Sequence, residues 1–217
     1  MTIDYAHARE MMVEQQVRPW EVLDARVLDV LGTLPREDFL PAEQRALAYA
    51  DVPLPLGGGA FSLKPVVVGR ALQALALDGS EDVLEIGTGN GYLTACLGQL
   101  ARDVVSIERD GERAAAADAA IKAHGLNNVQ VVNADAMAWD TPRRFKVICV
   151  TGAVEAIPQK FIRWLEPGGR MFIVRGRSPA MEAVLLHNDV NGPRIQSLFE
   201  TDLPYLAGAA PAPTFEF

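Results

Sequence analysis

The sequence is short of cysteine, histidine and positive charge. Its 217 residues include 2 cysteines and 3 histidines, and 28 acidic residues outweigh 20 basic ones, for a formal net charge of -8. Cys96 and Cys149 lie far apart in apolar surroundings, which excludes a disulfide framework and a paired metal-ligand motif. We expect two buried, reduced thiols and no metal site. The acidic balance argues against charge-driven binding of nucleic acid or of an acidic membrane surface.

Long apolar runs are missing as well. No run approaches the roughly 20 residues that a transmembrane helix requires. Residues 1–14 carry three acidic side chains and lack an apolar core segment, so we expect no signal peptide and a cytoplasmic location. No pattern in the sequence fixes an oligomeric state. What the chain does have is 49% hydrophobic residues, enough for one large core.

Alternating predicted strands and helices indicate an α/β fold with a doubly wound, mostly parallel sheet. Two amphipathic helices, at 4–17 and 24–34, precede this pattern, and Pro65 begins a third over 66–77. An antiparallel hairpin over 183–186 and 195–202 follows it. The alternating part consists of strands at 83–86, 104–107, 129–132, 145–150 and 170–174 and helices at 91–101, 112–124 and 158–165.

Residues 51–64 differ from the rest because prolines and glycines crowd into them. Pro53, Pro55 and Gly57 to Gly59 predict a loop without regular structure, serving as a linker or as a shaped functional loop. No other stretch separates two folding units. We therefore expect a single domain over 1–217, with a helical cap and this loop in 1–78, the sheet in 79–206 and a loosely attached tail in 207–217.

The sequence is organised around residues 83–91, where a short apolar strand meets three glycines at alternate positions. Strand, glycine turn and helix form the arrangement that binds nucleotide-like ligands in α/β sheets. A dinucleotide fingerprint would place its third glycine at Tyr92, but here it comes one residue early, at Gly91. Glu85, at the end of the strand, would repel a pyrophosphate if it pointed into the crevice, and it would suit a ligand with an ammonium group.

Acidic residues also end the next two predicted strands. Glu108 can accept both hydroxyls of a ribose, and Asp135 can accept a hydrogen bond from the exocyclic amine of adenine. Each has an ordinary alternative, since Glu108 fits a solvated strand end and Asp135 fits a turn. Both nevertheless fall on the same carboxyl edge of the sheet as the glycine turn. Ribose, adenine and ammonium without phosphate describe S-adenosylmethionine.

The sequence from about Met11 to Leu206 resembles the protein-L-isoaspartate O-methyltransferase family, in the glycine turn and in several other stretches. The glycine motif is common to many methyltransferases, whereas the Pro-Arg-Glu-x-Phe and Val-Thr-x-Ala-x(3)-Ile-Pro segments are far more specific. The resemblance rests on residues 12–17, 34–41, 48–51 with 54–57, 83–94, 105–109, 150–153 with 157–158, and 165–170.

The resemblance implies a Rossmann-like methyltransferase fold and an S-adenosylmethionine-dependent enzyme that methylates the abnormal carboxylate of isoaspartyl residues, a protein repair reaction. Its partners would be isoaspartyl-containing peptides or proteins. The cofactor residues expected from motif and resemblance together are Glu85, Gly87, Thr88, Gly89, Asn90, Gly91, Glu108, Arg109, Asp135 and Ala136.

The chain departs from the family just before Pro65. The family pattern there is Thr-Ile-Ser-x-Pro, with hydroxyls at the substrate carboxylate, whereas this chain has Phe61-Ser62-Leu63-Lys64. Ser62 is the candidate catalytic hydroxyl, although it stands one place early and neighbouring residues of an extended loop point in different directions. The candidate substrate-binding residues are Leu63, Lys64 and Thr151, with a surface lysine and a capping threonine as the alternatives.

Three hypotheses follow. The chain is a carboxyl O-methyltransferase for isoaspartyl peptides, a methyltransferase of the same fold for another acceptor, or a non-catalytic protein that binds the cofactor. Methyl transfer to an ionised carboxylate needs positioning rather than a strong base, so the loss of one hydroxyl is compatible with activity. An NAD-dependent dehydrogenase is disfavoured by the glycine spacing and by Glu85.

Overall fold

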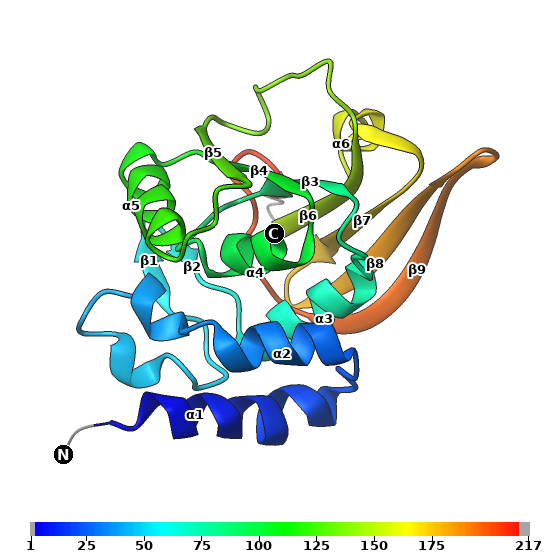
Figure 1. Cartoon of the computed structure of the whole chain (residues 1–217). Helices are drawn as coiled ribbons and strands as arrows, with labels where there is room; N and C mark the ends of the chain where they lie inside the picture. Colours follow the sequence, from blue (N-terminus) through cyan, green and yellow to red (C-terminus); the bar gives the residue numbers. More distant parts are fainter. Residues whose placement is uncertain (1–2, 213–217) are drawn as a thin grey trace, which may run out of the picture.

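The computed structural model describes residues 3–212. Its centre is a seven-stranded sheet in the order β5-β4-β3-β6-β7-β8-β9 (Figure 1). The pairs from β5 to β7 are parallel, and β8 and β9 continue antiparallel. This confirms the predicted doubly wound, mostly parallel sheet with an antiparallel hairpin. The strands are β3 (Asp82–Ile86), β4 (Asp103–Glu108), β5 (Val129–Asn133), β6 (Phe145–Val154), β7 (Leu165–Arg177), β8 (Ala180–Asp189) and β9 (Gly192–Thr201).

The two faces of the sheet are covered differently. Helices α4 (Tyr92–Leu100) and α5 (Gly111–Ala123) pack on one face, together with the N-terminal helices. The other face carries the short helix α6 (Gln159–Arg163), the segment after β5, and Leu206 and Ala209 from near the C-terminus. Successive strand residues point to opposite faces of the sheet. Val83 therefore packs in the hydrophobic core under α4 and α5, and Leu84 packs in the core on the side of α6.

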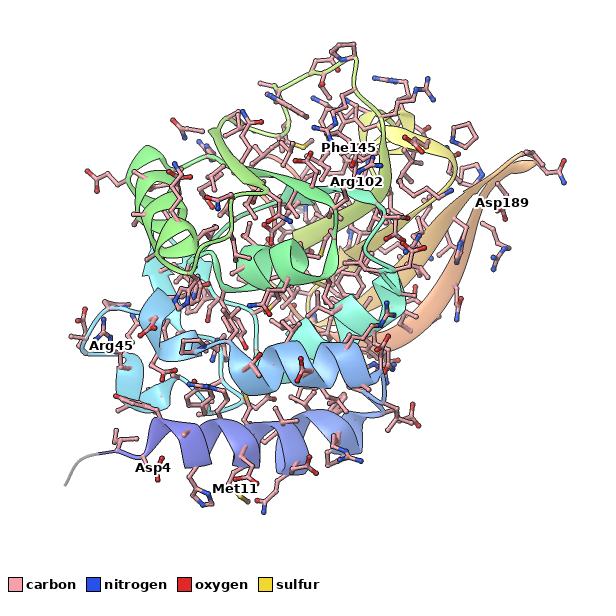
Figure 2. The ribbon with its side chains drawn as sticks, in the orientation of Figure 1. Asp4, Met11, Arg45, Arg102, Phe145 and Asp189 are labelled. Atoms are coloured by element: carbon pink, nitrogen blue, oxygen red, sulfur yellow. The ribbon has the colours of Figure 1, made fainter. Side chains whose placement is uncertain are left out.

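An aspartate caps the start of each of the first two helices. Asp4 accepts a hydrogen bond from the His7 amide at 3.0 Å and begins α1 (Tyr5–Met12) (Figure 2). The helix continues as a π turn (Val13–Val17) and a 3₁₀ turn (Arg18–Trp20), past its predicted end at residue 17. Pro19 is tolerated there because it lies in the first turn of the 3₁₀ segment, where its missing N–H is not needed. Asp24 caps α2 (Ala25–Thr33).

The stretch 51–64 contains a hairpin, so the prediction that it lacks regular structure is wrong. Strands β1 (Pro55–Gly57) and β2 (Ala60–Phe61) pair antiparallel. Gly57, Gly58 and Gly59 take φ angles of 83, 56 and 78°, which only glycine adopts easily, and so they form the turn instead of preventing pairing. Helix α3 (Pro65–Leu75) follows, and its Val66 amide donates to Asp51 Oδ1 at 3.1 Å.

The chain ends by returning across the sheet. The β8–β9 hairpin projects from the molecule with Asp189 near its tip (Figure 2). The chain then runs beside β6, where Leu206 N donates to Ala153 O at 2.8 Å and Glu155 N donates to Ala209 O at 3.0 Å. The expected loose tail is therefore wrong for residues 207–209, and residues 213–217 lie outside the described part. Within residues 3–212, none of the helices combines the length and apolar composition needed to cross a membrane.

Candidate active site

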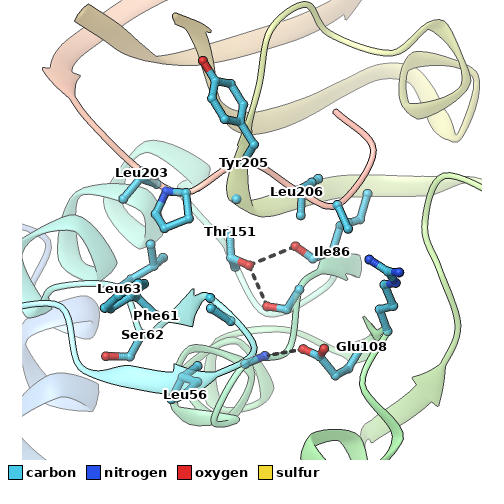
Figure 3. A pocket seen from close by; sticks show the side chains of 18 of the residues that line it. Leu56, Phe61, Ser62, Leu63, Ile86, Glu108, Thr151, Leu203, Tyr205 and Leu206 are labelled. Atoms are coloured by element: carbon cyan, nitrogen blue, oxygen red, sulfur yellow. Dashed lines mark hydrogen bonds between the residues drawn. The ribbon is translucent and has the colours of Figure 1, made fainter. Parts of the chain in front are cut away.

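The carboxyl ends of β3, β4 and β6 open into a cavity of about 560 Å³ (Figure 3). It lies where the chain reverses its winding direction, the place where open α/β sheets bind ligands. Three parts of the chain form its wall: the hairpin region before α3, the strand ends, and the C-terminal segment, which we define as residues 201–209. Most predicted site residues line this cavity, namely Ser62, Leu63, Lys64, Gly87, Gly89, Glu108, Arg109, Asp135, Ala136 and Thr151.

The glycine turn (residues 87–91) is fastened to its neighbours on both sides. Gly87 has a φ angle of 97° and donates its amide to Ile107 O at 2.8 Å. Thr151 Oγ1, from β6, donates to Ile86 O and Gly87 O at 3.0 and 2.7 Å. A side chain at residue 87 would collide with that hydroxyl, because its Cβ would lie 2.2 Å from Oγ1. Thr151 therefore lines the cavity, but its hydroxyl is already hydrogen-bonded to two carbonyls at the glycine turn.

Glu108 is held in one orientation at the end of β4. Its Oε2 accepts from the Gly89 amide and its Oε1 from the Asp110 amide, both at 3.0 Å. Arg113 pairs with Oε1 at 3.3 Å and also donates to Leu56 O at 3.0 Å, so it links the β1–β2 hairpin to Glu108. The result is a fixed carboxylate at the cavity wall, suited to accepting hydrogen bonds from ligand hydroxyls.

Asp135 and Arg109 lie together at the adjoining strand ends. Asp135 Oδ1 accepts from the Met137 amide at 2.9 Å, which is the turn that the sequence offered as an alternative role. Its Oδ2 lies 3.7 Å from Arg109 Nε, and both side chains remain partly exposed. One carboxylate oxygen therefore shapes the backbone while the other is available to a ligand.

Glu85 does not point into the crevice, and the expectation that it faces a ligand ammonium is corrected. Its side chain is completely buried on the helical side of β3, where Oε2 accepts from Thr94 Oγ1 at 2.5 Å and Ser106 Oγ at 2.6 Å. Strand alternation explains the difference, because Ile86 takes the face that lines the cavity. Burial raises the pKa of Glu85 to about 8, against the opposing effect of the two hydroxyl donors.

Thr88, Asn90 and Gly91 also lie outside the lining of the large cavity. Thr88 Oγ1 is 2.6 Å from Ser106 Oγ, behind the turn. Gly91 precedes α4, and a Cβ on it would lie 3.1 Å from that of Ala117, so it allows close helix packing. Asn90 and Thr88 border a second, smaller cavity of about 30 Å³ beside the first.

The segment 61–64 presents apolar rather than hydroxyl groups to the cavity. Ser62 is 7% exposed, and its Oγ accepts from Leu54 N at 3.1 Å and from Arg36 Nη2 at 3.2 Å. Figure 3 shows its hydroxyl pointing away from Thr151 and Glu108. Leu63 is half-buried in the wall, while Lys64 is exposed at the start of α3.

Sequence analysis missed the C-terminal segment, of which residues 201–207 line the cavity. The absence of a side chain at Gly152 leaves room for the C-terminal segment, because a Cβ there would lie 2.7 Å from Leu206 Cδ2 and 3.2 Å from the Leu206 amide nitrogen. Ala153 then pairs with the segment by accepting from Leu206 N and donating to Pro204 O at 2.9 Å. A glycine directly after Thr151 was the one sequence signal for this close approach.

Comparison with known proteins agrees with this geometry. Residues 7–198 match the family described as Protein-L-isoaspartate(D-aspartate) O-methyltransferase (PCMT). The chain is 38% identical to Protein-L-isoaspartate O-methyltransferase 1 of Rhodopseudomonas palustris (strain HaA2), over 94% of this chain and 84% of that one. It is also 38% identical to Protein-L-isoaspartate O-methyltransferase 2 of Marinobacter nauticus (strain ATCC 700491 / DSM 11845 / VT8), over 84% of each.

The fold is likewise shared with a solved structure. A putative protein-L-isoaspartate O-methyltransferase from Plasmodium falciparum, in complex with S-adenosyl-L-homocysteine, superposes with a TM-score of 0.79 at 16% identity, covering 94% of this chain and 99% of that one. The sequence match, the fold and the site at the winding reversal agree. The chain therefore belongs to the protein-L-isoaspartate O-methyltransferase family and is an S-adenosylmethionine-dependent methyltransferase.

Proposed function

We propose that this chain transfers the methyl group of S-adenosylmethionine to the carboxylate of isoaspartyl residues in peptides and proteins. The observation that carries the proposal is that the glycine turn, Glu108 and the segment 61–64 all open onto one cavity. A donor at the strand ends and an acceptor at the segment 61–64 would share that space, as direct displacement requires. The names of the relatives support the choice of acceptor.

The residues at the strand ends fit S-adenosylmethionine. Gly87 and Gly89 leave the backbone bare where the ligand must come close. Glu108, fixed by two amides, suits the two ribose hydroxyls. Asp135 has one oxygen free of backbone bonds for the exocyclic amine of adenine. We assign to the cofactor Gly87, Gly89, Glu108, Arg109, Asp135 and Ala136.

Other predicted cofactor residues are assigned to support rather than contact. Thr88 and Glu85 join Ser106 in a buried network under the turn, and Gly91 seats the start of α4. Thr151 holds Ile86 O and Gly87 O with its hydroxyl, so we treat it as a positioning residue instead of a substrate ligand.

When bound, S-adenosylmethionine supplies a methyl group on a positively charged sulfur. The acceptor carboxylate is already ionised at pH 7, so the chain needs no general base. Its work is to orient the acceptor and keep water out. Leu63, Leu203 and Leu206 line the cavity and exclude water, and exposed Lys64 attracts a carboxylate at the rim. The Ser62 hydroxyl is buried and accepts from Leu54 N and Arg36 Nη2, so we assign Ser62 to holding the segment 61–64 in place rather than to contact with the acceptor.

A second candidate is the same reaction on another acceptor. It is favoured by Leu63, which puts an apolar side chain where the family pattern has a serine, and by the apolar C-terminal segment opposite. We place either reaction in the cytoplasm, since the two cysteines are free and buried, as suits a reducing compartment. We treat 1–217 as one domain, with 1–78 as cap and loop, 79–206 as cofactor-binding sheet and 207–217 as tail.

The decisive experiment pairs an isoaspartyl peptide with its aspartyl twin and follows methyl transfer from labelled S-adenosylmethionine. We expect incorporation into the isoaspartyl peptide alone, as a base-labile ester. Incorporation into neither peptide, with cofactor binding intact by calorimetry, would reject the isoaspartyl acceptor and favour another one. Absence of cofactor binding would reject the assignment of the strand-end residues.

A further inference from the structure

The segment 135–139, directly after β5, forms a tight turn at the wall of the large cavity. Its first three residues, Asp135 to Met137, line the cavity. The carbonyl of Asp135 accepts from the amides of Ala138 and Trp139 at 2.9 and 2.7 Å, which closes the turn. A single turn leaves the carbonyls at its end without backbone partners, because no further turn follows to donate to them. Another group must therefore satisfy those carbonyls.

Lys160 supplies that group from helix α6, which lies beside the connection between β5 and β6 (Figure 1). Its Nζ donates to Met137 O at 2.9 Å and to Trp139 O at 2.8 Å. The same ammonium lies 5.1 Å from the centre of the Trp164 ring, where the face of the ring attracts a cation. Lys160 is half-buried and is not among the residues that line either cavity. It therefore acts on the turn and not on a ligand.

Two tryptophans keep α6 and the segment 135–139 in register. Trp164, directly after the helix, is 3% exposed, and its Nε1 donates to Asp140 Oδ1 at 3.3 Å. The rings of Trp164 and Trp139 meet edge to face, with their centroids 5.2 Å apart. The packed rings fix the distance that the Lys160 side chain has to span, so its ammonium reaches both carbonyls from a defined position.

The position of the Asp135 carboxylate depends on this turn. Met137 N donates to Asp135 Oδ1 at 2.9 Å, and Met137 O is one of the two carbonyls that Lys160 holds. The other Asp135 oxygen lies 3.7 Å from Arg109 Nε, a looser contact, and the Asp135 side chain is 42% exposed. Exposed side chains change rotamer readily unless a neighbour fixes them. The bond from Met137 thus fixes one oxygen and leaves the second one aimed at the cavity.

We infer that Lys160 is a positioning residue for recognition of the adenine base, acting through Met137 and Asp135 without touching the ligand. A carboxylate held in place before the ligand arrives accepts a hydrogen bond without first having to be ordered. The inference rests on the proposed function, in which Asp135 accepts from the exocyclic amine of adenine. It gives α6 a part in selecting the methyl donor, although no residue of that helix lines either cavity.

Calorimetry with two ligands separates recognition of the base from binding in general. S-adenosyl-L-homocysteine carries the exocyclic amine, and S-inosyl-L-homocysteine carries a carbonyl oxygen in its place. We expect the wild-type protein to bind the adenosyl ligand about tenfold more tightly or better, because the amine donates to Asp135 whereas the oxygen faces a carboxylate. Lys160→Met keeps an unbranched apolar side chain and removes the ammonium. It should weaken the adenosyl ligand about 5- to 20-fold, leave the inosyl ligand nearly unchanged and so abolish most of the preference.

Two further variants distinguish positioning from stability. Lys160→Arg keeps the charge and can donate to both carbonyls, so it should retain most of the preference for the adenosyl ligand. Arg170→Met is the matched control, because Arg170 also donates to two backbone carbonyls, at the end of α3 and away from both cavities. It should lower the melting temperature and leave the preference unchanged. If Lys160→Met does not fold, Lys160→Gln, which is neutral and shorter, replaces it with the same expected loss.

A double variant tests the path through Asp135. Asp135→Asn keeps an oxygen for Met137 N and removes the negative charge that the amine needs, so it should itself lose the preference for the adenosyl ligand. Adding Lys160→Met to Asp135→Asn should then change the preference little, because the two side chains act on one hydrogen bond. Independent, additive losses would mean that Lys160 does not act through Asp135.

The inference is overturned if Lys160→Met keeps the wild-type preference, whatever happens to its melting temperature, or if Arg170→Met loses the preference to the same extent. Either result leaves the assignment of Asp135 to adenine in force. A wild-type protein that binds both ligands equally rejects that assignment and the role of Lys160 together. Inactivity on isoaspartyl peptides rejects the proposed acceptor alone, because the binding measurements do not depend on turnover.

Discussion

Thr151 packs directly against Gly87. The Thr151 hydroxyl donates to the Gly87 carbonyl at 2.7 Å, and a Cβ on Gly87 would lie 2.2 Å from the Thr151 Oγ1. Glycine is therefore required at this position for two reasons. Its φ angle is 97°, and a side chain would collide with Thr151 of β6. The turn that faces the cavity is set by a contact from the neighbouring strand.

Gly87→Ala should lower the free energy of unfolding by about 2 to 4 kcal/mol, from the left-handed backbone and the collision together. Thr151→Ala alone should cost about 1 kcal/mol, because two carbonyls lose a donor. In the double variant the collision disappears, so its loss should be smaller than the sum of the single losses. Urea denaturation measures all three, and strictly additive losses would contradict the contact.

Gly152→Ala should displace the C-terminal segment. A Cβ there would meet Leu206 Cδ2 at 2.7 Å, which a well-packed wall does not accommodate without movement. We expect weaker binding of S-adenosyl-L-homocysteine, or a higher KM for the acceptor, with the sheet intact by circular dichroism. Leu206→Ala in the same chain should restore part of the loss. A Gly152→Ala protein with unaltered binding constants would show that the segment does not bound the ligand site.

Glu85 should make the protein less stable as the pH rises. Its pKa in the folded state is raised to about 8, so between its ordinary value and about 8 the folded chain keeps a proton that the unfolded chain releases. The free energy of unfolding therefore falls with increasing pH across that window. Glu85→Gln removes the ionisation while keeping the shape of the protonated acid. The difference in melting temperature, variant minus wild type, should grow from about pH 5 to about pH 8 and then level off.

A pH-independent difference would mean that Glu85 stays ionised in the folded protein. Wild type and variant must be measured in the same buffer at each pH, because the test is how the difference between their melting temperatures changes with pH.

Leu63→Ser should return a hydroxyl to the acceptor side of the cavity. A hydrogen bond to a charged acceptor contributes about 1.5 to 3 kcal/mol, so kcat/KM for an isoaspartyl peptide should rise about tenfold or more. Affinity for S-adenosyl-L-homocysteine should not change. Leu63→Ala is the matched control, since it removes the same side chain without adding a hydroxyl. An equal gain in both variants would trace the effect to space rather than to the hydroxyl.

Much of the sheet was predictable, because its parallel strands are short apolar runs that are bounded by glycine or acidic residues. Glu108 and Asp135 were found by the same reasoning, since residues that follow parallel strands meet at one edge. The orientation of Glu85 was not predictable in this way. Alternation puts it opposite to Ile86, but only the packed helices decide which of the two faces the cavity.

The remaining errors have a common physical origin. The hairpin at residues 55–61 forms because its glycines supply the turn, whereas composition alone treats glycine as a breaker of structure. The C-terminal segment carries no motif, and its place depends on the contact between Leu206 and Gly152, which lies 54 residues earlier in the sequence (206 − 152). Contacts of that range are set by tertiary packing, which local patterns do not encode.

The cavity wall formed by residues 201–207 has a consequence for biosynthesis. Translation makes the glycine turn and Glu108 long before this stretch leaves the ribosome, so a nascent chain has its donor residues while one side of the cavity is still open. The parallel strands all precede Thr201 in the sequence, whereas that wall begins at Thr201. The residues assigned to the methyl donor are therefore made before the wall that closes their cavity.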